Sequence, residues 1–188
     1  TATQTVTVVD NANPSLVAPS NMTVSAGNAC TVTIANLGTP VATDNCTLAS
    51  VTNNAPASFP LGNTTVTWTA TDAAGNSTTA TQTITVIDNT NPTITAPANV
   101  TASADNNCVA TTVTLGTATT ADNCTVASVT NNAPASFPLG TTTVTWTVTD
   151  GSGNIATATQ TVTVVDNANP SLVAPANMTV SAGNACTA

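Results

Sequence analysis

Apolar and polar residues alternate along most of the chain, and this alternation predicts β-strands joined by turns. In the clearest run, Val66, Trp68 and Ala70 fall on one face and Thr residues on the other. The opposite phase would bury the hydroxyl groups and expose the Trp, so we expect the apolar face to point into a core. Residues 77–87 form a second run, with Ile84 and Val86 among its inward positions.

Turn residues separate these runs. Between the two strongest strands, residues 72–76 predict a tight hairpin in which Gly75 has a left-handed backbone. Near the start of the chain, Pro19 interrupts an otherwise regular run, and because proline cannot donate to a strand ladder, we expect this broken strand at the edge of a sheet. Further strands are predicted over residues 30–37 and 47–52.

The same pattern returns at a fixed interval. Asp10-Asn11-Ala12-Asn13-Pro14 recurs at residues 88–92 and 166–170, in each case 78 residues further on, and we call these three segments the joints. Such a period indicates an array of small domains. The expected organisation is the last strand of a preceding repeat at 1–10, repeat 1 at 11–88, repeat 2 at 89–166, and the first strand of a following repeat at 167–188.

Six or seven short strands per repeat, with turn signals every eight to twelve residues, favour an antiparallel two-sheet sandwich. The fold class is therefore expected to be all-β, as tandem immunoglobulin-like Greek-key β-sandwiches.

The segment from Phe59 to Asn76, FPLGNTTVTWTATDAAGN, resembles the signature FPxGxTxVxxxAxDxxGN of the HYR domain, or hyalin repeat. Residues 137–154 carry a similar segment. The resemblance implies an immunoglobulin-like module, and long arrays of such modules are typical of secreted surface proteins of Bacteroidetes, including large gliding adhesins.

The charge of the chain narrows the function classes. There is no Lys, Arg, His, Glu or Tyr, about a quarter of the residues are Thr, and eight Asp give a net charge of −8. Nothing here can neutralise phosphates, so we expect no nucleic-acid binding. No apolar run is long enough to span a membrane. With no general acid or base near neutral pH and no nucleophile motif, we expect no enzymatic activity.

Cysteine positions indicate disulfides in an oxidising, extracellular setting, since none of the spacings resembles a zinc site. We favour pairings within repeats, Cys30 with Cys46 and Cys108 with Cys124, which leaves Cys186 where a third pair would begin. If the second strand runs the full height of the sandwich, however, Cys30 and Cys46 lie at opposite ends. Cys30 could then meet Cys124 across the joint.

Carboxylates are expected to gather at one end of each repeat, where an immunoglobulin-like sandwich brings together the joint, a loop and the last hairpin. Such carboxylates repel one another, which raises their pKa values unless a cation is present. Oxygen ligands suit calcium, and the joint resembles the DxNDNxP linker through which cadherins bind calcium, with Asn13 at its second acidic position. The candidate ligands are Asp10, Asn11, Asn13, Asp44, Asp72, Asp88, Asn89, Asn91, Asp122, Asp150 and Asp166. The alternative is that these are ordinary turn residues bonded to their own backbone.

The sequence thus predicts a structural repeat section of an extracellular bacterial filament, stalk or giant adhesin, with disulfides and calcium stiffening the joints. The expected partners are neighbouring repeats, with lateral self-association into a fibre as a further possibility because no charged residue protects the edge strands. The alternative function is a cell-surface module that binds glycans or a protein partner.

Overall fold

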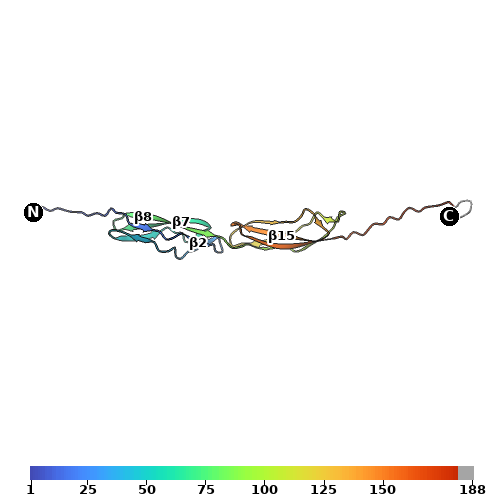
Figure 1. The fold of residues 1–188 in the computed structure, drawn as a ribbon, viewed down its shortest axis with the longest axis horizontal. Coiled ribbons are helices and arrows are strands. Elements are labelled where there is room, and N and C mark those ends of the chain that lie inside the picture. The colour runs from blue at the N-terminus through green and yellow to red at the C-terminus, as the bar shows by residue number, and fades with distance from the viewer. Residues whose placement is uncertain (182–188) are drawn as a thin grey trace. The chain divides into compact units, whose positions relative to one another are not determined.

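The computed structural model describes residues 1–181, and every regular element within them is a β-strand (Figure 1). Strands β1 to β8 belong to repeat 1 and strands β9 to β16 to repeat 2. Among the described residues there is no helix long and apolar enough to cross a membrane.

The larger sheet of repeat 1 has four strands in the order β2-β8-β7-β5. Its two long strands, β7 (Gly62–Asp72) and β8 (Ser77–Ile87), pair antiparallel. One edge is β5 (Leu48–Asn53), antiparallel to β7, and the other is β2 (Met22–Ser25), which runs parallel to β8. The edge position predicted for the strand broken at Pro19 is confirmed, and its parallel pairing is a feature that the alternation did not reveal.

The second layer of repeat 1 consists of two short antiparallel pairs. Strand β1 (Ser15–Val17) pairs with β4 (Val41–Thr43), and β3 (Thr31–Val32) pairs with β6 (Phe59–Pro60). Apolar side chains from β1, β3 and β6 belong to the same core as those of β7 and β8. Repeat 1 is therefore a two-layer, immunoglobulin-like β-sandwich, as the sequence predicted.

The core has the predicted phase. Val66, Trp68 and Ala70 on β7 are buried, as are Ile84 and Val86 on β8. The Thr residues between them face outward or lie half-buried. The hairpin that joins the two strands turns at a glycine with φ of 96°, which confirms the left-handed position.

A buried polar residue, Gln82, joins the layers of repeat 1. It lies on the inward face of β8 with no exposed surface. Its Oε1 accepts a hydrogen bond from Trp68 Nε1 at 3.1 Å, and its Nε2 donates to the carbonyl oxygens of Ser20 at 2.7 Å and Leu37 at 2.9 Å. Because a buried polar group is costly unless its partners are present, these three bonds hold the Pro19 break and the loop at Leu37 against the long sheet.

Repeat 2 has the same plan, with a sheet in the order β10-β16-β15-β13 and the pairs β9 with β12 and β11 with β14. Gln160 Oε1 accepts a hydrogen bond from Trp146 Nε1 at 3.1 Å, as Gln82 Oε1 accepts one from Trp68. The strands are β9 (Thr93–Thr95), β10 (Val100–Ser103), β11 (Val109–Ala110), β12 (Thr119–Ala121), β13 (Val126–Asn131), β14 (Phe137–Pro138), β15 (Gly140–Asp150) and β16 (Ile155–Val165).

Several predicted strands differ in the structure. Residues 1–9 and 167–181 are exposed, and neither 1–10 nor 167–181 forms a strand, because within the described residues neither segment finds another strand with which to pair. The strand expected over residues 30–37 is reduced to β3, and β4 forms between the two strands expected over residues 30–37 and 47–52. Cys186 lies outside the described residues.

Packing divides the chain into two compact units that do not coincide with the repeats. The larger unit comprises Thr1–Ala98, Leu115–Ala133 and Val144–Gln160. It therefore holds the whole of repeat 1 together with the loop and the hairpin of repeat 2 that carry Asp122 and Asp150.

Candidate metal centre

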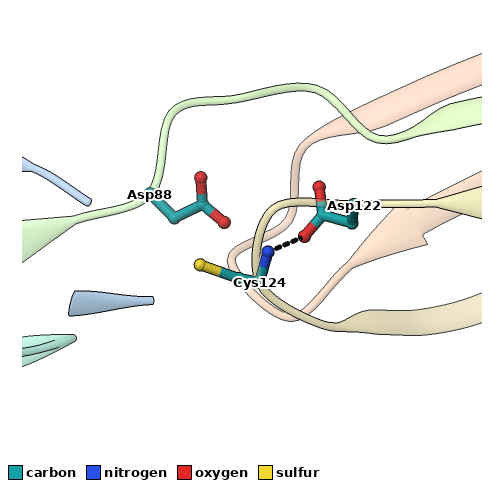
Figure 2. A group of neighbouring side chains, drawn as sticks. All are labelled: Asp88, Asp122 and Cys124. Atoms are coloured by element: carbon teal, nitrogen blue, oxygen red, sulfur yellow. Dashed lines mark hydrogen bonds between the residues drawn. The ribbon is translucent and has the colours of Figure 1, made fainter. Parts of the chain in front are cut away.

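The structure gathers acidic side chains at the joint end of each repeat. In repeat 1, one oxygen from each of Asp10, Asp44 and Asp72 lies within 4.8 Å of the other two. In repeat 2, Asp88 and Asp122 lie within the same distance of each other and of the Cys124 sulfur. Figure 2 shows the Asp88 carboxylate facing the loop that carries Asp122 and Cys124.

Local hydrogen bonds shape the loop before β13. The Cys124 N–H donates to Asp122 Oδ2 at 2.9 Å, drawn as the dashed line in Figure 2. Asn123 Nδ2 donates to Asp88 Oδ1 at 3.3 Å, and the Thr90 N–H donates to the same Asp88 oxygen at 3.0 Å. Short Asp and Asn side chains favour such turns, and here the turns also orient the second oxygen of each carboxylate.

Three side-chain oxygens in this region are buried and have no hydrogen-bond partner: Asp88 Oδ2, Asp122 Oδ1 and Asn123 Oδ1. Asp88 is only 9% exposed. An unpaired buried acceptor costs about 1–3 kcal/mol, and more when it is charged. The loop before β13 and the joint therefore present oxygens that lack a partner, and a bound cation would supply one.

The hairpin between β15 and β16 is hydrogen-bonded to the joint. Both oxygens of Asp150 accept hydrogen bonds from Asn154, from its backbone at 2.7 Å and from its side chain at 2.7 Å. The same Asn154 Nδ2 also donates to the carbonyl oxygen of Asp88 at 3.2 Å. Asn154 thus links the hairpin to the joint, and Asn76 makes the equivalent bonds to Asp72 and Asp10 in repeat 1.

Hydrogen bonds, rather than repulsion between carboxylates, determine the direction of the pKa shifts of Asp10 and Asp150. The backbone N–H of Ala12 lowers the pKa of Asp10. Burial acts to raise the pKa of Asp150, but the hydrogen bonds from Asn154 and Ser152 outweigh it and the pKa is lowered. The sequence-based expectation of raised values is therefore wrong for these two residues, because local donors compensate the negative charge. The hydrogen bond with Asp10 and the surrounding carboxylates raise the pKa of the Cys46 thiol.

The remaining candidate ligands lie outside the clusters. Asp166 is exposed and accepts a hydrogen bond from the Ala168 N–H at 2.9 Å, a turn within its own joint. The joint amides Asn11, Asn13, Asn89 and Asn91 are exposed. The amides that do contact the clusters, Asn45, Asn76, Asn123 and Asn154, were not among the predicted ligands. Asn76 and Asn154 follow the glycine of the GN signature, and Asn45 and Asn123 stand between an Asp and a Cys. Both positions were therefore recognisable in the sequence.

The cysteines pair across the joint. The structure joins Cys30 to Cys124, with Cα atoms 4.8 Å apart, and leaves Cys46 and Cys108 as exposed free thiols. The pairing of Cys30 with Cys46 is therefore wrong. The Cys30 carbonyl accepts a hydrogen bond from the Leu61 N–H, at the start of β7, whereas Cys46 precedes the strand residue that pairs with Asp72, at the end of β7.

The length of β7 explains this outcome. Its eleven residues span about 35 Å at the usual rise of a strand. A disulfide needs Cα atoms within about 7 Å, so Cys30 and Cys46 lie much too far apart. The same separation holds for Cys108 and Cys124 on the matching ends of repeat 2, and the pairing across the joint is the alternative that meets the distance.

The chain matches the model of the HYR domain twice, over residues 9–86 and 87–164, and it therefore belongs to the HYR domain family. The sequence had placed the repeats at 11–88 and 89–166. Comparison with curated proteins gives no match.

Among solved structures, the chain is similar to the protocadherin gamma B7 extracellular cadherin domains 1–4, with 11% identity, a TM-score of 0.36, and coverage of 82% of this chain and 51% of that one. It is also similar to the protocadherin gamma B4 extracellular domain, with 15% identity, a TM-score of 0.35 and coverage of 82% and 32%. For mouse cadherin-23 EC22-24 the identity is 18%, the TM-score 0.35 and the coverage 84% and 66%. The chain thus spans about half the length of the first of these structures.

Proposed function

We propose that this chain is a structural repeat section of an extracellular filament, stalk or giant adhesin, in which the joint is held by a disulfide and by calcium. The observation that carries the metal is the set of three buried oxygens without partners, on Asp88, Asp122 and Asn123. The chain has no Lys, Arg or His whose charge could compensate them.

The donor set selects the kind of cation. Carboxylate and amide oxygens are hard ligands, and calcium accepts six to eight of them in flexible geometry. The Cys124 sulfur is already bonded to Cys30, so it offers no thiolate to a softer metal such as zinc. In repeat 2, Asp88, Asp122 and Asn123 would hold the ion. In repeat 1, Asp10, Asp44 and Asp72 would do so.

A structural role is supported by the way in which the joint is built. The Cys30–Cys124 disulfide fixes two segments that are 94 residues apart in the chain. Disulfides persist in oxidising compartments, which supports an extracellular location. The absence of Lys and Arg removes every site for trypsin-like proteases. Neighbouring repeats are the proposed partners, and the uncharged edge strands β5 and β13 would permit lateral association into a fibre.

The metal is tested by thermal unfolding of the full chain in millimolar calcium and in excess EDTA. A ligand at about one hundred times its Kd stabilises the folded state by about 2.7 kcal/mol, so calcium should raise the melting temperature by several degrees. Asp122→Asn keeps an oxygen that can accept from the Cys124 N–H but removes one charge, and it should reduce this calcium effect.

The matched control is Asp105→Asn. This carboxylate is exposed and accepts hydrogen bonds only from the backbone of its own turn, at Asn107 and Val109. The variant should keep the full response to calcium. Equal melting temperatures in calcium and in EDTA for the unsubstituted chain would eliminate the metal from the proposal and leave the disulfide as the only clamp.

The role as a spacer is tested separately from the metal. A titrated glycan array should show no saturable binding to the chain, whereas a glycan-binding module would give a defined affinity. Electron microscopy of the protein in calcium distinguishes the two forms of assembly, because a stalk would appear as single strings and a fibre as thicker bundles.

A further inference from the structure

The outward face of the larger sheet in repeat 1 is covered with threonine side chains. Strands β7 and β8 pair antiparallel along their length, so each outward residue of one strand lies opposite an outward residue of the other. All the central outward residues are Thr, and each is exposed or half-buried. We define the threonine face as these six residues: Thr65 with Thr83, Thr67 with Thr81, and Thr69 with Thr79.

Neighbouring residues extend this face without adding charge. On β5, Thr52 lies opposite Thr69, and Ser50 lies opposite Thr71. Every outward residue of β7 and β8 before Ile87 is Asn, Ser or Thr. In repeat 2, the outward residues of β15 are likewise all Thr. Hydroxyl and methyl groups thus cover the centre of the sheet, and no ionisable group lies among them.

The hydroxyl groups of the threonine face are free to bind another surface. Within the part of the chain that the structure describes, none of the six forms a hydrogen bond with another side chain, whereas Thr85 at the margin donates to Asn63 Oδ1 at 2.8 Å. A hydroxyl group has one donor and two acceptor lone pairs. Each of the six can therefore both donate to and accept from a layer of molecules that covers the face.

The threonine face has two repeat distances. Opposite residues on adjacent strands lie about 4.8 Å apart, and alternate residues along one strand lie about 6.8 Å apart. In ice each oxygen has four tetrahedral neighbours at about 2.75 Å, so oxygens that share a neighbour lie about 4.5 Å apart and the layers repeat at about 7.3 Å. Both distances on the face therefore agree with those of ice to within about a tenth. Because sheets twist, the agreement extends over neighbouring rows only, and two long strands supply such rows.

We propose that the threonine face binds the surface of an ice crystal. Its hydroxyl groups would take positions that water oxygens occupy in the outermost layer of ice, and its methyl groups would fill the spaces between them. A single hydroxyl group gains little, because liquid water offers the same hydrogen bonds. Binding thus requires many groups at matching positions, which the paired strands provide. The inference rests on neither the calcium nor the disulfide of the joint.

The test measures the partition of the full chain into ice. A ball of pure ice is grown slowly in a stirred solution of the protein, and tryptophan absorbance gives the concentration in the melted ice and in the remaining liquid. A growing ice front excludes ordinary solutes, so a protein that does not bind ice stays in the liquid. We expect the concentration of this chain in the melted ice to equal or exceed that in the liquid.

The test variant places Lys at the same position of β8 and β16, as Thr81→Lys with Thr159→Lys, and both residues are exposed. Because an ammonium group is a compact and strongly hydrated charge, the ice-to-liquid ratio should fall about tenfold. The matched control, Thr39→Lys with Thr117→Lys, adds the same charge at exposed residues of the loops before β4 and β12. It should keep the ratio of the unsubstituted chain.

Two results would overturn the proposal. In the first, the unsubstituted chain stays in the liquid. In the second, the Lys pair on the threonine face lowers the ratio no more than the control pair does, so that the face has no part in the partition. Melting temperatures show that each variant is folded. If the first pair lowers the melting temperature, Thr79→Lys with Thr157→Lys repeats the test at exposed residues of the adjacent row.

Discussion

The joint ends of the two repeats share one set of local hydrogen bonds and differ in their surroundings. Asp10 is half-buried, Asn45 is exposed and Cys46 is free, whereas their counterparts are a buried Asp88, a half-buried Asn123 and a Cys124 bonded to Cys30. The joint end of repeat 1 has one buried oxygen without a partner, on Asp44, and the joint end of repeat 2, with Asp88 of the joint included, has three.

This difference separates what a repeat forms alone from what its neighbour adds. The turn at Asp44, the hairpin at Asp72 and the bond from Asn76 to the joint form in both repeats at nearly the same distances. Among the described residues, the burial of the joint carboxylate, Asp88, and the disulfide occur where repeat 1 supplies Cys30 and the Gly27 carbonyl, which accepts from Asn123 at 3.5 Å. Each repeat therefore forms its ligand loops without its neighbour. The number of buried oxygens that lack a partner, which a cation could supply, is larger where the neighbouring repeat completes the joint.

The largest effect should come from removing the disulfide. Cys30→Ser with Cys124→Ser should lower the free energy of unfolding by about 4.7 kcal/mol, as the chain-entropy model gives for a loop of this length. The matched variant, Cys46→Ser with Cys108→Ser, removes the same number of sulfurs and should change little. Urea unfolding under non-reducing conditions measures both. Equal losses in the two variants would mean that the bonded and free cysteines contribute alike.

The second largest effect should come from the core, which is the part of the molecule most alike in the two repeats. Gln82→Met leaves the Trp68 N–H and two carbonyl oxygens unpaired and should destabilise repeat 1 by about 3 kcal/mol. In a Trp146→Phe background, fluorescence of Trp68 reports repeat 1 alone. Gln160→Met in the same background is the control, and a shift of the Trp68 transition by that variant would show that the repeats unfold as one unit.

A smaller effect is expected in the calcium affinities of the two clusters. Because the cluster of repeat 2 has more buried oxygens without a hydrogen-bond partner, we expect it to bind calcium about tenfold more tightly than the cluster of repeat 1. Calorimetric titration of Asp44→Asn and Asp122→Asn isolates each site in turn. The ranking is contradicted if Asp44→Asn removes the tighter of the two binding steps.

The smallest effect is the dependence on acid. The pKa of Asp150 is lower in the folded chain than its usual value of about 3.9. The hydrogen-bonded carboxylate therefore adds stability above about pH 4, and that stability is lost as the pH falls through the folded value. Fluorescence of Trp146 in a Trp68→Phe background follows repeat 2 through this range. Asp150→Asn should flatten the pH dependence, and an unchanged slope would contradict the assignment.

The sequence predicted those parts of the fold that depend on the alternation of apolar and polar residues and on turn residues. The burial of Trp68, the hairpin at Gly75 and the edge strand broken at Pro19 all followed from alternation and turn residues. The parallel pairing of β2 with β8 did not, because alternation contains no information about which strands become neighbours. Gln82 stands in the inward phase of its strand, and that position was the available signal for a buried hydrogen-bonded group.

At the candidate site, the sequence predicted that Asp10, Asp44 and Asp72 belong to one end of a repeat, because all three follow strands or joints that reach that end. It favoured the wrong disulfide, because a spacing of 16 residues between cysteines does not reveal that a long strand lies between their positions in space. The amides that hold the carboxylates were missed because Asn is common in the turns of this chain.

The parallel pairing of β2 with β8 has a mechanical consequence. In repeat 1, Met22 to Ser25 lie beside Ile84 to Ile87, and the Ala26 N–H adds a bond of 2.7 Å to the Ile87 carbonyl. Tension on the ends of the repeat would pull β2, near its start, and β8, its last strand, in opposite directions along their length. Their hydrogen bonds would then be loaded in shear and would have to break together rather than one at a time. Resistance to extension would thus lie in the strand pair nearest the points of pulling, while the core between the layers carried little of the load.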